Sequence, residues 1–167
     1  MKLAGFYDES ISNGLGWRAV IFVSGCPHNC ENCHNKEAQD FNYGTEFNSK
    51  EIIEKICDNS ILKGVTLSGG EPLCKENVAE VLKFIQSLKK EKSSLNIWCY
   101  TGYTYEELVA REDDVTKEAL GNIDVLIDGP FVDSCKAPNL KFRGSTNQRI
   151  IDLKNTLQNN SVIELAV

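Results

Sequence analysis

Strand and helix patterns alternate four times along this chain, and this alternation restricts the fold more than any other feature of the sequence. Short runs rich in β-branched and aromatic residues predict strands, and charged stretches with apolar residues at helical spacing separate them. The predicted strands cover residues 17–23, 65–67, 95–100 and 123–127. Repeated strand–helix units predict a mostly parallel sheet with right-handed crossovers. Because a closed eight-unit barrel needs ~250 residues, a chain of 167 residues predicts one α/β domain, residues 1–167, with either a partial (β/α) barrel or an open sheet.

Helices are expected between these strands, where capping signals precede amphipathic segments. Capping-box spacing begins at Asn48 and again at Thr104, each time ahead of a segment with helical periodicity. Residues 78–88 have apolar side chains on one helical face and charged residues between them. Residues 148–153 and 162–167 are each predicted to add a further short strand.

Unusual residues follow each predicted strand, in four separate loops. The loops carry Cys26-Pro27-His28-Asn29-Cys30-Glu31-Asn32-Cys33, Gly69-Gly70-Glu71-Pro72, Thr101-Gly102 and Asp128-Gly129-Pro130. The carboxyl ends of parallel strands share one edge of a sheet or barrel, and active sites form at that edge. The sequence therefore predicts one functional site, built from these four loops.

Three of the seven cysteines fall within eight residues, whereas the other four are scattered. They form the pattern Cys26-x3-Cys30-x2-Cys33. On a helix these thiols would spread ~10 Å along the axis, too far for one ion with metal–sulfur bonds of ~2.3 Å. A loop around an iron–sulfur cluster fits better, because each thiolate can bind a different iron. A Cys3His zinc site that uses His28 or His34 is the alternative, and Cys74 is a conceivable fourth ligand.

Further motifs occur in an order that resembles a known superfamily. They are Asn13-Gly14-Leu15-Gly16, Phe22-Val23-Ser24-Gly25-Cys26, Cys33-His34-Asn35, Ser68-Gly69-Gly70-Glu71-Pro72-Leu73, Tyr100-Thr101-Gly102-Tyr103, Asp128-Gly129-Pro130-Phe131 and Phe142-Arg143-Gly144-Ser145-Thr146-Asn147-Gln148-Arg149. The cysteine pattern followed by the glycine-rich turn resembles the radical S-adenosylmethionine (SAM) superfamily. The full set resembles, over nearly the whole chain, its family of activating proteins for anaerobic (class III) ribonucleoside-triphosphate reductase. One departure is Asn32, where many superfamily members have an aromatic residue.

The resemblance implies a partial (β/α) barrel of the radical SAM type that holds a [4Fe-4S] cluster and SAM. Cys26, Cys30 and Cys33 would bind the cluster and would be catalytic through it. Reductive cleavage of SAM would give a 5′-deoxyadenosyl radical, which takes a hydrogen atom from a glycine in the glycyl-radical subunit of the reductase. A one-electron donor such as flavodoxin or ferredoxin would supply the electron.

The same resemblance implies a set of SAM-binding residues around the cluster. Gly69 and Gly70 would approach the methionine amino group of SAM through their backbone, and Glu71 would add a carboxylate near that ammonium. Asp128 would contact the ribose hydroxyls or a cation, and Thr101 is a weaker candidate of the same kind. The backbone of Asn32, Cys33 and His34 would contact the adenine.

Net charge and hydropathy exclude several other classes of protein. The 24 acidic against 18 basic residues give a net charge of −6, which argues against binding to nucleic acid. The longest apolar run, residues 19–23, is far short of the ~20 residues of a membrane span. No signal-peptide pattern begins the chain, so a cytoplasmic location without membrane attachment is expected.

Two further functions and one unassigned segment stay open at this point. The same chemistry could serve another glycyl-radical enzyme, such as pyruvate formate-lyase. A non-catalytic Cys3His zinc module that binds a partner is the alternative from another class. Residues 136–149 carry four basic side chains and no acidic ones. We expect this stretch either to dock the partner or contact the SAM carboxylate through Arg143, or to be a solvated loop.

Overall fold

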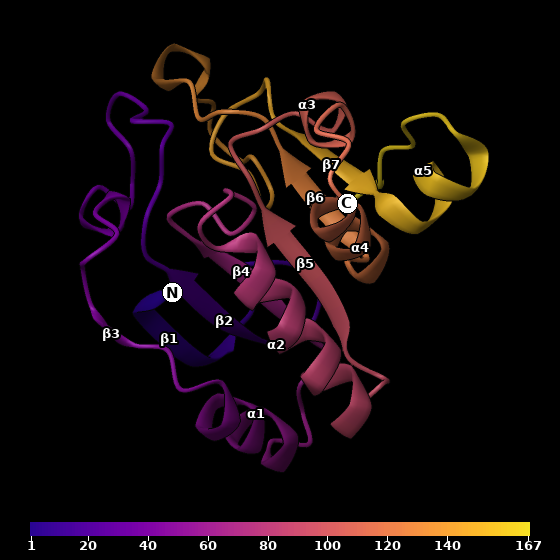
Figure 1. Ribbon diagram of the computed structural model, residues 1–167. Helices are drawn as coiled ribbons and strands as arrows, with labels where there is room; N and C mark the ends of the chain where they lie inside the picture. The colour runs from indigo at the N-terminus through magenta and orange to yellow at the C-terminus, as the bar shows by residue number, and fades with distance from the viewer.

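Seven strands form one mixed sheet in the computed structural model, which describes all 167 residues (Figure 1). The strands are β1 (Lys2–Ser10), β2 (Arg18–Val23), β3 (Thr45–Glu46), β4 (Gly64–Gly69), β5 (Asn96–Tyr100), β6 (Val125–Asp128) and β7 (Arg149–Asp152). Their order across the sheet is β3-β1-β2-β4-β5-β6-β7. The four central strands β2, β4, β5 and β6 run parallel, whereas β1, β3 and β7 are antiparallel to their neighbours. The predicted α/β class with a parallel central sheet is confirmed.

Five α-helices and two short 3-10 helices connect the strands. They are η1 (Glu37–Gln39), α1 (Ser49–Asp58), α2 (Val78–Glu91), α3 (Tyr105–Val109), α4 (Asp114–Asn122), η2 (Asp133–Cys135) and α5 (Leu153–Asn159). Asn48 caps α1 by accepting a hydrogen bond from the backbone N–H of Glu51, and Thr104 forms a complete capping box with Glu107. Both predicted helix starts are therefore confirmed. No helix combines the length and the apolar character that crossing a lipid bilayer requires.

The structure contains elements that the sequence did not predict, β1, β3, α4 and α5 among them, and lacks one that it did. β1 is not predicted, because none of its residues is fully buried and its sequence lacks a strong apolar alternation. α4 is also missed, although Asp113 caps its amino end by accepting from Thr116 N–H. Residues 162–167 do not form the expected strand: Glu164 makes only an isolated bridge to Ile151 of β7.

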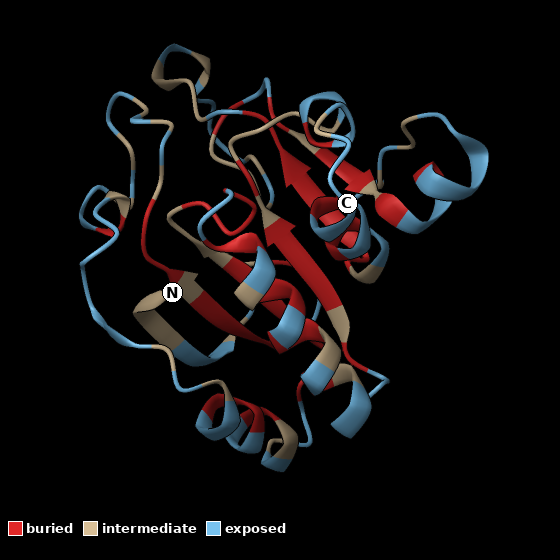
Figure 2. Ribbon diagram, viewed as in Figure 1, coloured by how far each residue is buried: buried red, intermediate tan, exposed pale blue.

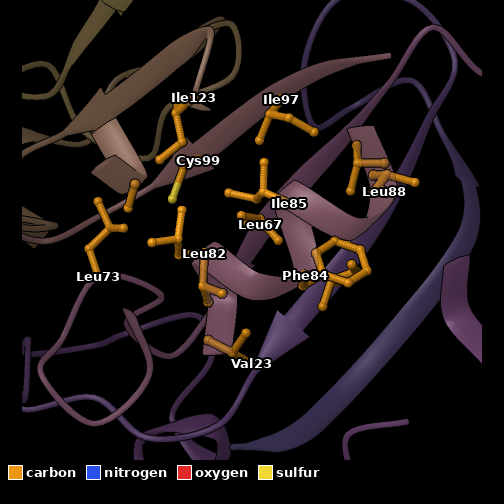
Figure 3. Close-up of a cluster of buried hydrophobic side chains, with 14 of the residues drawn as sticks. Val23, Leu67, Leu73, Leu82, Phe84, Ile85, Leu88, Ile97, Cys99 and Ile123 are labelled. Carbon is orange, nitrogen blue, oxygen red and sulfur yellow. The ribbon is translucent and has the colours of Figure 1, made fainter. Parts of the chain in front are cut away.

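The main hydrophobic core lies between the helices and one face of the sheet. It contains 26 buried residues, most of them from β2, β4, β5, β6 and β7 and from the five helices. Figure 2 shows the central strands as buried and the outward faces of the helices as exposed. Ile85 and Leu88 of α2 lie over Leu67 of β4 and Ile97 of β5 in Figure 3. This packing fixes the helices on one face and leaves the other face of the sheet to form the floor of a cavity.

That other face contains a fully buried arginine. Arg18 Nε donates to Thr66 Oγ1 over 2.7 Å, and its terminal nitrogens donate to Asn96 Oδ1 and the Val65 carbonyl over 2.6 and 2.8 Å. Its guanidinium also lies over the Trp98 ring, 5.1 Å from the centroid. Burial without a carboxylate partner lowers the pKa of Arg18 to about 10. The cation is therefore held by neutral acceptors, which link β2, β4 and β5 across this face.

Candidate functional site

A cavity of about 440 Å³ opens at the carboxyl ends of the parallel strands. Its wall combines loops that follow β2, β4, β5 and β6, as the alternation of strands and helices predicts. The sequence-predicted residues that line it are Cys26, Cys30, Cys33, His34, Gly69, Gly70, Glu71 and Thr101. Asn32 and Asp128 do not line it. Residues far apart in the chain are thus brought together around one hollow.

The cysteine loop (residues 26–33) follows β2 and contributes Cys26, His28, Cys30 and Cys33 to the lining of this cavity. The backbone N–H of Gly25 donates to the Ala38 carbonyl over 2.8 Å, and that of Cys26 donates to the Gln39 carbonyl over 3.0 Å. Asn29 and Asn32 adopt left-handed backbone conformations, which asparagine tolerates better than most residues. The loop is therefore a tight, irregular turn rather than a helix, as its sequence predicts.

All three thiols of the cysteine loop are free and partly exposed. Partial burial raises the pKa of Cys26 to about 11, and the nearby Glu71 carboxylate adds to this rise. A bound metal would remove this penalty, because a thiolate that ligates a cation is stabilised by it. The Cys26 sulfur is therefore a poor anion by itself and a suitable ligand for a cationic group.

The arrangement of donors fits a multi-iron cluster better than a single ion. No three His, Cys, Asp or Glu side chains lie close enough together to hold one metal ion. Thiolates spread along one loop can instead each bind a different iron of a cluster. Cys74 is buried and does not line the cavity, so the geometry offers no fourth cysteine there.

The glycine turn (residues 69–72) packs against Gly25, the residue that precedes the cysteine loop. Gly69 has a positive φ of 94°, and a Cβ atom there would lie 2.5 Å from the Val23 carbonyl oxygen. The backbone N–H of Glu71 donates to the Gly25 carbonyl over 2.8 Å, which joins the turn to the start of the cysteine loop. Only residues without side chains allow this close approach of the two backbones.

The Glu71 carboxylate is fully buried and is bound by four donors of the protein. Oε1 accepts from Leu73 N–H and Thr101 Oγ1, each over 2.9 Å. Oε2 accepts from Gly102 N–H over 2.7 Å and lies 2.8 Å from His28 Nε2. This carboxylate therefore connects three loops of the site, including the cysteine loop.

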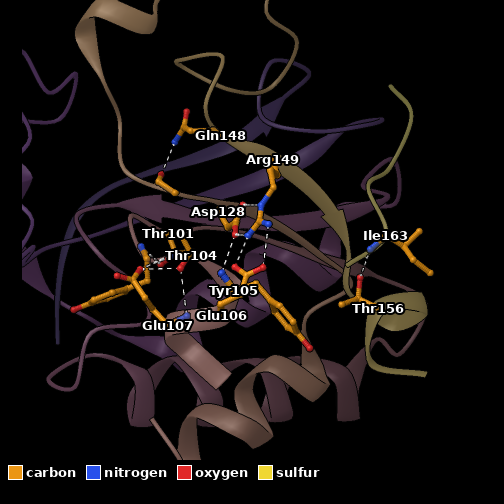
Figure 4. A network of polar contacts seen from close by, with 12 residues as sticks. Thr101, Thr104, Tyr105, Glu106, Glu107, Asp128, Gln148, Arg149, Thr156 and Ile163 are labelled. Atoms are coloured by element: carbon orange, nitrogen blue, oxygen red, sulfur yellow. Dashed lines mark hydrogen bonds and ion pairs between the residues drawn. The ribbon is translucent and has the colours of Figure 1, made fainter. Parts of the chain in front are cut away.

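Asp128 is also occupied by protein donors, as Figure 4 shows. Its carboxylate accepts from Tyr105 N–H over 2.8 Å and from Arg149 Nε over 3.0 Å. Arg149 also donates to Glu106, and hydrogen bonds to both carboxylates raise its pKa. Asp128 thus faces a salt-bridge network behind the cavity wall, which leaves it no free oxygen directed at a ligand.

Asn32 and His34 take different positions at the rim of the cavity. The Asn32 side chain is exposed and donates to Asp133 Oδ2 over 3.1 Å. The His34 ring lines the cavity and lies 4.9 Å from the Phe131 ring. The cysteine loop is therefore in contact with the segment that follows β6.

Several further residues line the cavity, on strands and on loops, that were not predicted from the sequence as site residues. These are Ser12, Asn13, Phe22, Ser68, Tyr100, Leu140 and Phe142. Two features of the sequence could have identified these residues. The first is the pair of glycines at 14 and 16, which predicts a turn next to Ser12 and Asn13. The second feature is the alternation of side chains along a strand, by which Phe22 and Ser68 point away from the helix-covered core.

The basic stretch from 136 to 149 divides into several roles in the structure. Arg143 lines the cavity while its terminal nitrogen donates to the Gln148 carbonyl over 2.8 Å. Lys136 pairs with Asp133 over 2.6 Å and lies over the Phe131 ring. Of the basic residues in this stretch, Arg143 is the one that lines the cavity.

Comparison with known proteins gives consistent matches over most of the chain. A family model described as a 4Fe-4S single cluster domain matches residues 12–151. A Pasteurella multocida protein is 41% identical over 90% of this chain and 96% of its own length. A protein of Escherichia coli K12 is 40% identical over 92% of this chain and 100% of its own, and one of phage T4 is 34% identical over 90% and 93%. All three are named anaerobic ribonucleoside-triphosphate reductase-activating protein.

Proposed function

Since this chain belongs to the family of anaerobic ribonucleoside-triphosphate reductase-activating proteins, we propose that it is a radical SAM enzyme that activates such a reductase. A [4Fe-4S] cluster and SAM, when bound, supply a 5′-deoxyadenosyl radical able to take a hydrogen atom from a glycine Cα of the reductase. The observation that carries the proposal is the shared cavity of the cysteine loop and the glycine turn. This cavity brings three thiols next to the partly exposed backbone of Gly69 and Gly70, and these are the two features that a cluster and an amino-acid-bearing ligand need.

We assign the binding roles according to which groups are free to face the cavity. Cys26, Cys30 and Cys33 would hold the cluster, and this use of only three thiols leaves one iron open to SAM. The backbone of Gly69 and Gly70 would contact the methionine part of SAM. The backbone of the cysteine loop would contact its adenine. Glu71 and Asp128 are not assigned as ligands of SAM, because protein donors already occupy their carboxylates.

We further propose that residues 1–167 form one radical SAM domain with a partial barrel. A sheet with two edges leaves a lateral opening, through which a loop of the reductase can reach the cavity. Docking of that loop would then shield the site from water. A one-electron donor such as flavodoxin or ferredoxin and a cytoplasmic location complete the proposal.

Anaerobic reconstitution with iron and sulfide tests the cluster assignment. We expect a brown protein with about four irons per chain, bleached by dithionite, that converts SAM to 5′-deoxyadenosine. Alanine at any one of the three loop cysteines should abolish this conversion, whereas Cys57→Ala, remote from the cavity, should leave it unchanged. A colourless protein that binds zinc and takes up no iron would refute the proposal.

The choice of partner is tested by mixing the reduced protein with SAM and purified glycyl-radical enzymes. Electron paramagnetic resonance should detect a glycyl radical on anaerobic ribonucleoside-triphosphate reductase and none on pyruvate formate-lyase. A radical that forms only on pyruvate formate-lyase would contradict the assigned partner while leaving the chemistry intact.

A further inference from the structure

The cysteine loop has few backbone attachments to the rest of the protein. Between residues 27 and 33 its one backbone hydrogen bond runs from Cys33 N–H to the Cys30 carbonyl, and therefore stays within the loop. Two side chains connect this part of the loop to other segments by hydrogen bonds. Exposed Asn32 donates to Asp133, and His28 contacts the buried carboxylate of Glu71. Exposed polar pairs contribute little to stability, because water competes for both partners. The contact between His28 and Glu71 is thus the principal buried attachment of the loop.

His28 is held in place from several sides. Its Nε2 lies 2.8 Å from Glu71 Oε2, an oxygen that already accepts from Gly102 N–H. A carboxylate only accepts hydrogen bonds, so we assign the proton to Nε2 and treat His28 as the donor. The ring also packs edge-on against Tyr103, with centroids 4.3 Å apart. A Cβ atom at Gly102 would lie 2.4 Å from His28 Cδ2, so glycine is needed for the ring to fit.

Glu71 is correspondingly suited to act as a fixed anchor rather than as a ligand. Its carboxylate has no exposed surface, and the other three donors come from Leu73, Thr101 and Gly102. Arg111 supports the same region, because it donates to the Leu73 carbonyl over 2.5 Å. A carboxylate with this many fixed donors can hold the His28 ring without moving itself.

We propose that His28 and Glu71 form a clamp that fixes the cysteine loop over the glycine turn. Both are positioning residues: they act through the loop, which sets where the cluster lies relative to the backbone of Gly69 and Gly70. The proposal rests on the proposed function, because it concerns the geometry of that same cluster. It predicts that breaking the clamp loosens the loop although all three thiols remain.

The test compares His28→Leu and His28→Gln with Asp133→Ala, a control that removes the exposed attachment of the same loop. In the reconstituted protein we measure the rate of iron release to a chelator. His28→Leu should release iron about tenfold faster or more, because a hydrogen bond to a buried charged group is lost. His28→Gln should recover most of the wild-type rate, since its Nε2 can donate to Glu71. Asp133→Ala should match the wild type within about twofold.

A second measurement separates the clamp from the proposed function. Amide hydrogen exchange at Cys26 and Cys33, the two amides of the loop that donate to backbone carbonyls, should be faster in the metal-free full chain of His28→Leu than in the wild type and in the other two variants. Equal exchange and equal iron release in His28→Leu and Asp133→Ala would overturn the clamp. A wild-type protein that takes up no iron would instead refute the proposed function, and the exchange experiment would still decide whether the clamp exists.

Discussion

Replacing Gly70 by alanine is the sharpest test of how the glycine turn supports the cysteine loop. A Cβ atom at this position would lie 2.4 Å from the Gly25 carbonyl oxygen and 2.7 Å from the Ala38 carbonyl oxygen. Ordinary contact begins at 3.4 Å, so the Gly25 oxygen would have to retreat by about 1 Å. Both oxygens belong to backbone, which cannot swing away as the end of a side chain can.

The same two oxygens hold the loop in place, which sets the size of the effect. The Gly25 oxygen accepts from Glu71 N–H, and the Ala38 oxygen accepts from Gly25 N–H, each over 2.8 Å. Weakening these two hydrogen bonds costs about 1 kcal/mol each, and overpacking adds about 1–3 kcal/mol. We therefore expect Gly70→Ala to lower the free energy of unfolding by about 3–5 kcal/mol.

Urea unfolding of the metal-free chain measures this loss, with Gly121→Ala as the matched control. Gly121 lies in α4, and a Cβ atom added there would have no other atom within 4 Å. Alanine there should raise the free energy of unfolding by about 0.5–1 kcal/mol, because glycine is the weaker helix former. Gly70→Ala protein with wild-type stability and wild-type iron uptake would refute the close-approach argument.

Three further predictions concern buried and paired groups. Arg18→Met should lower the free energy of unfolding by about 2–4 kcal/mol in urea titrations, because it leaves several buried acceptors unpaired; an unchanged midpoint would contradict this. Cys74 and Cys99 are buried, and burial raises the pKa of both thiols, that of Cys74 to about 12. Iodoacetamide at a pH of about 8, near the pKa of a free thiol, should therefore label neither residue until the chain unfolds, and mass spectrometry would reveal any native labelling. Hydrogen bonds from Arg149 lower the pKa of Glu106 below its ordinary 4.5. That pair stabilises the fold above pH 4.5, and the stabilisation is lost as the pH falls through the lowered pKa. Glu106→Gln should therefore cost about 0.2–1 kcal/mol at neutral pH and nothing in strong acid, whereas a pH-independent cost would exclude the pairing as its cause.

Local patterns identified the central part of the fold correctly. The four predicted strands correspond to β2, β4, β5 and β6, because their apolar runs are buried on both faces of the sheet. The capping box at Thr104 is complete, since it depends on residues only three positions apart. β1 was not predicted, because its half-exposed residues form a strand through pairing with β2. A short stretch of sequence does not indicate that pairing.

The edge of the sheet at which the predicted site residues gather was correct, and their roles toward a cluster and SAM stay predictions. The order of strands and loops placed Cys26, Gly69 and Thr101 at one edge, and all three line the cavity. Glu71 was expected near the SAM ammonium and Asp128 near its ribose. Each of these carboxylates is instead bound by protein donors from distant parts of the chain.

Periodicity, short spacings and residue chemistry were sufficient to predict the parallel core and the edge at which the loops gather, and they identified the three cysteines of one loop as candidate sulfur donors. All three kinds of information can be read along the chain, because they involve residues that are close neighbours in it. Which polar groups are free for a ligand could be learned only from the folded molecule. Whether a carboxylate such as Glu71 is available depends on donors up to 43 positions away in the chain, as with His28. The packing of the whole sheet brings such donors into place, and no local pattern records it.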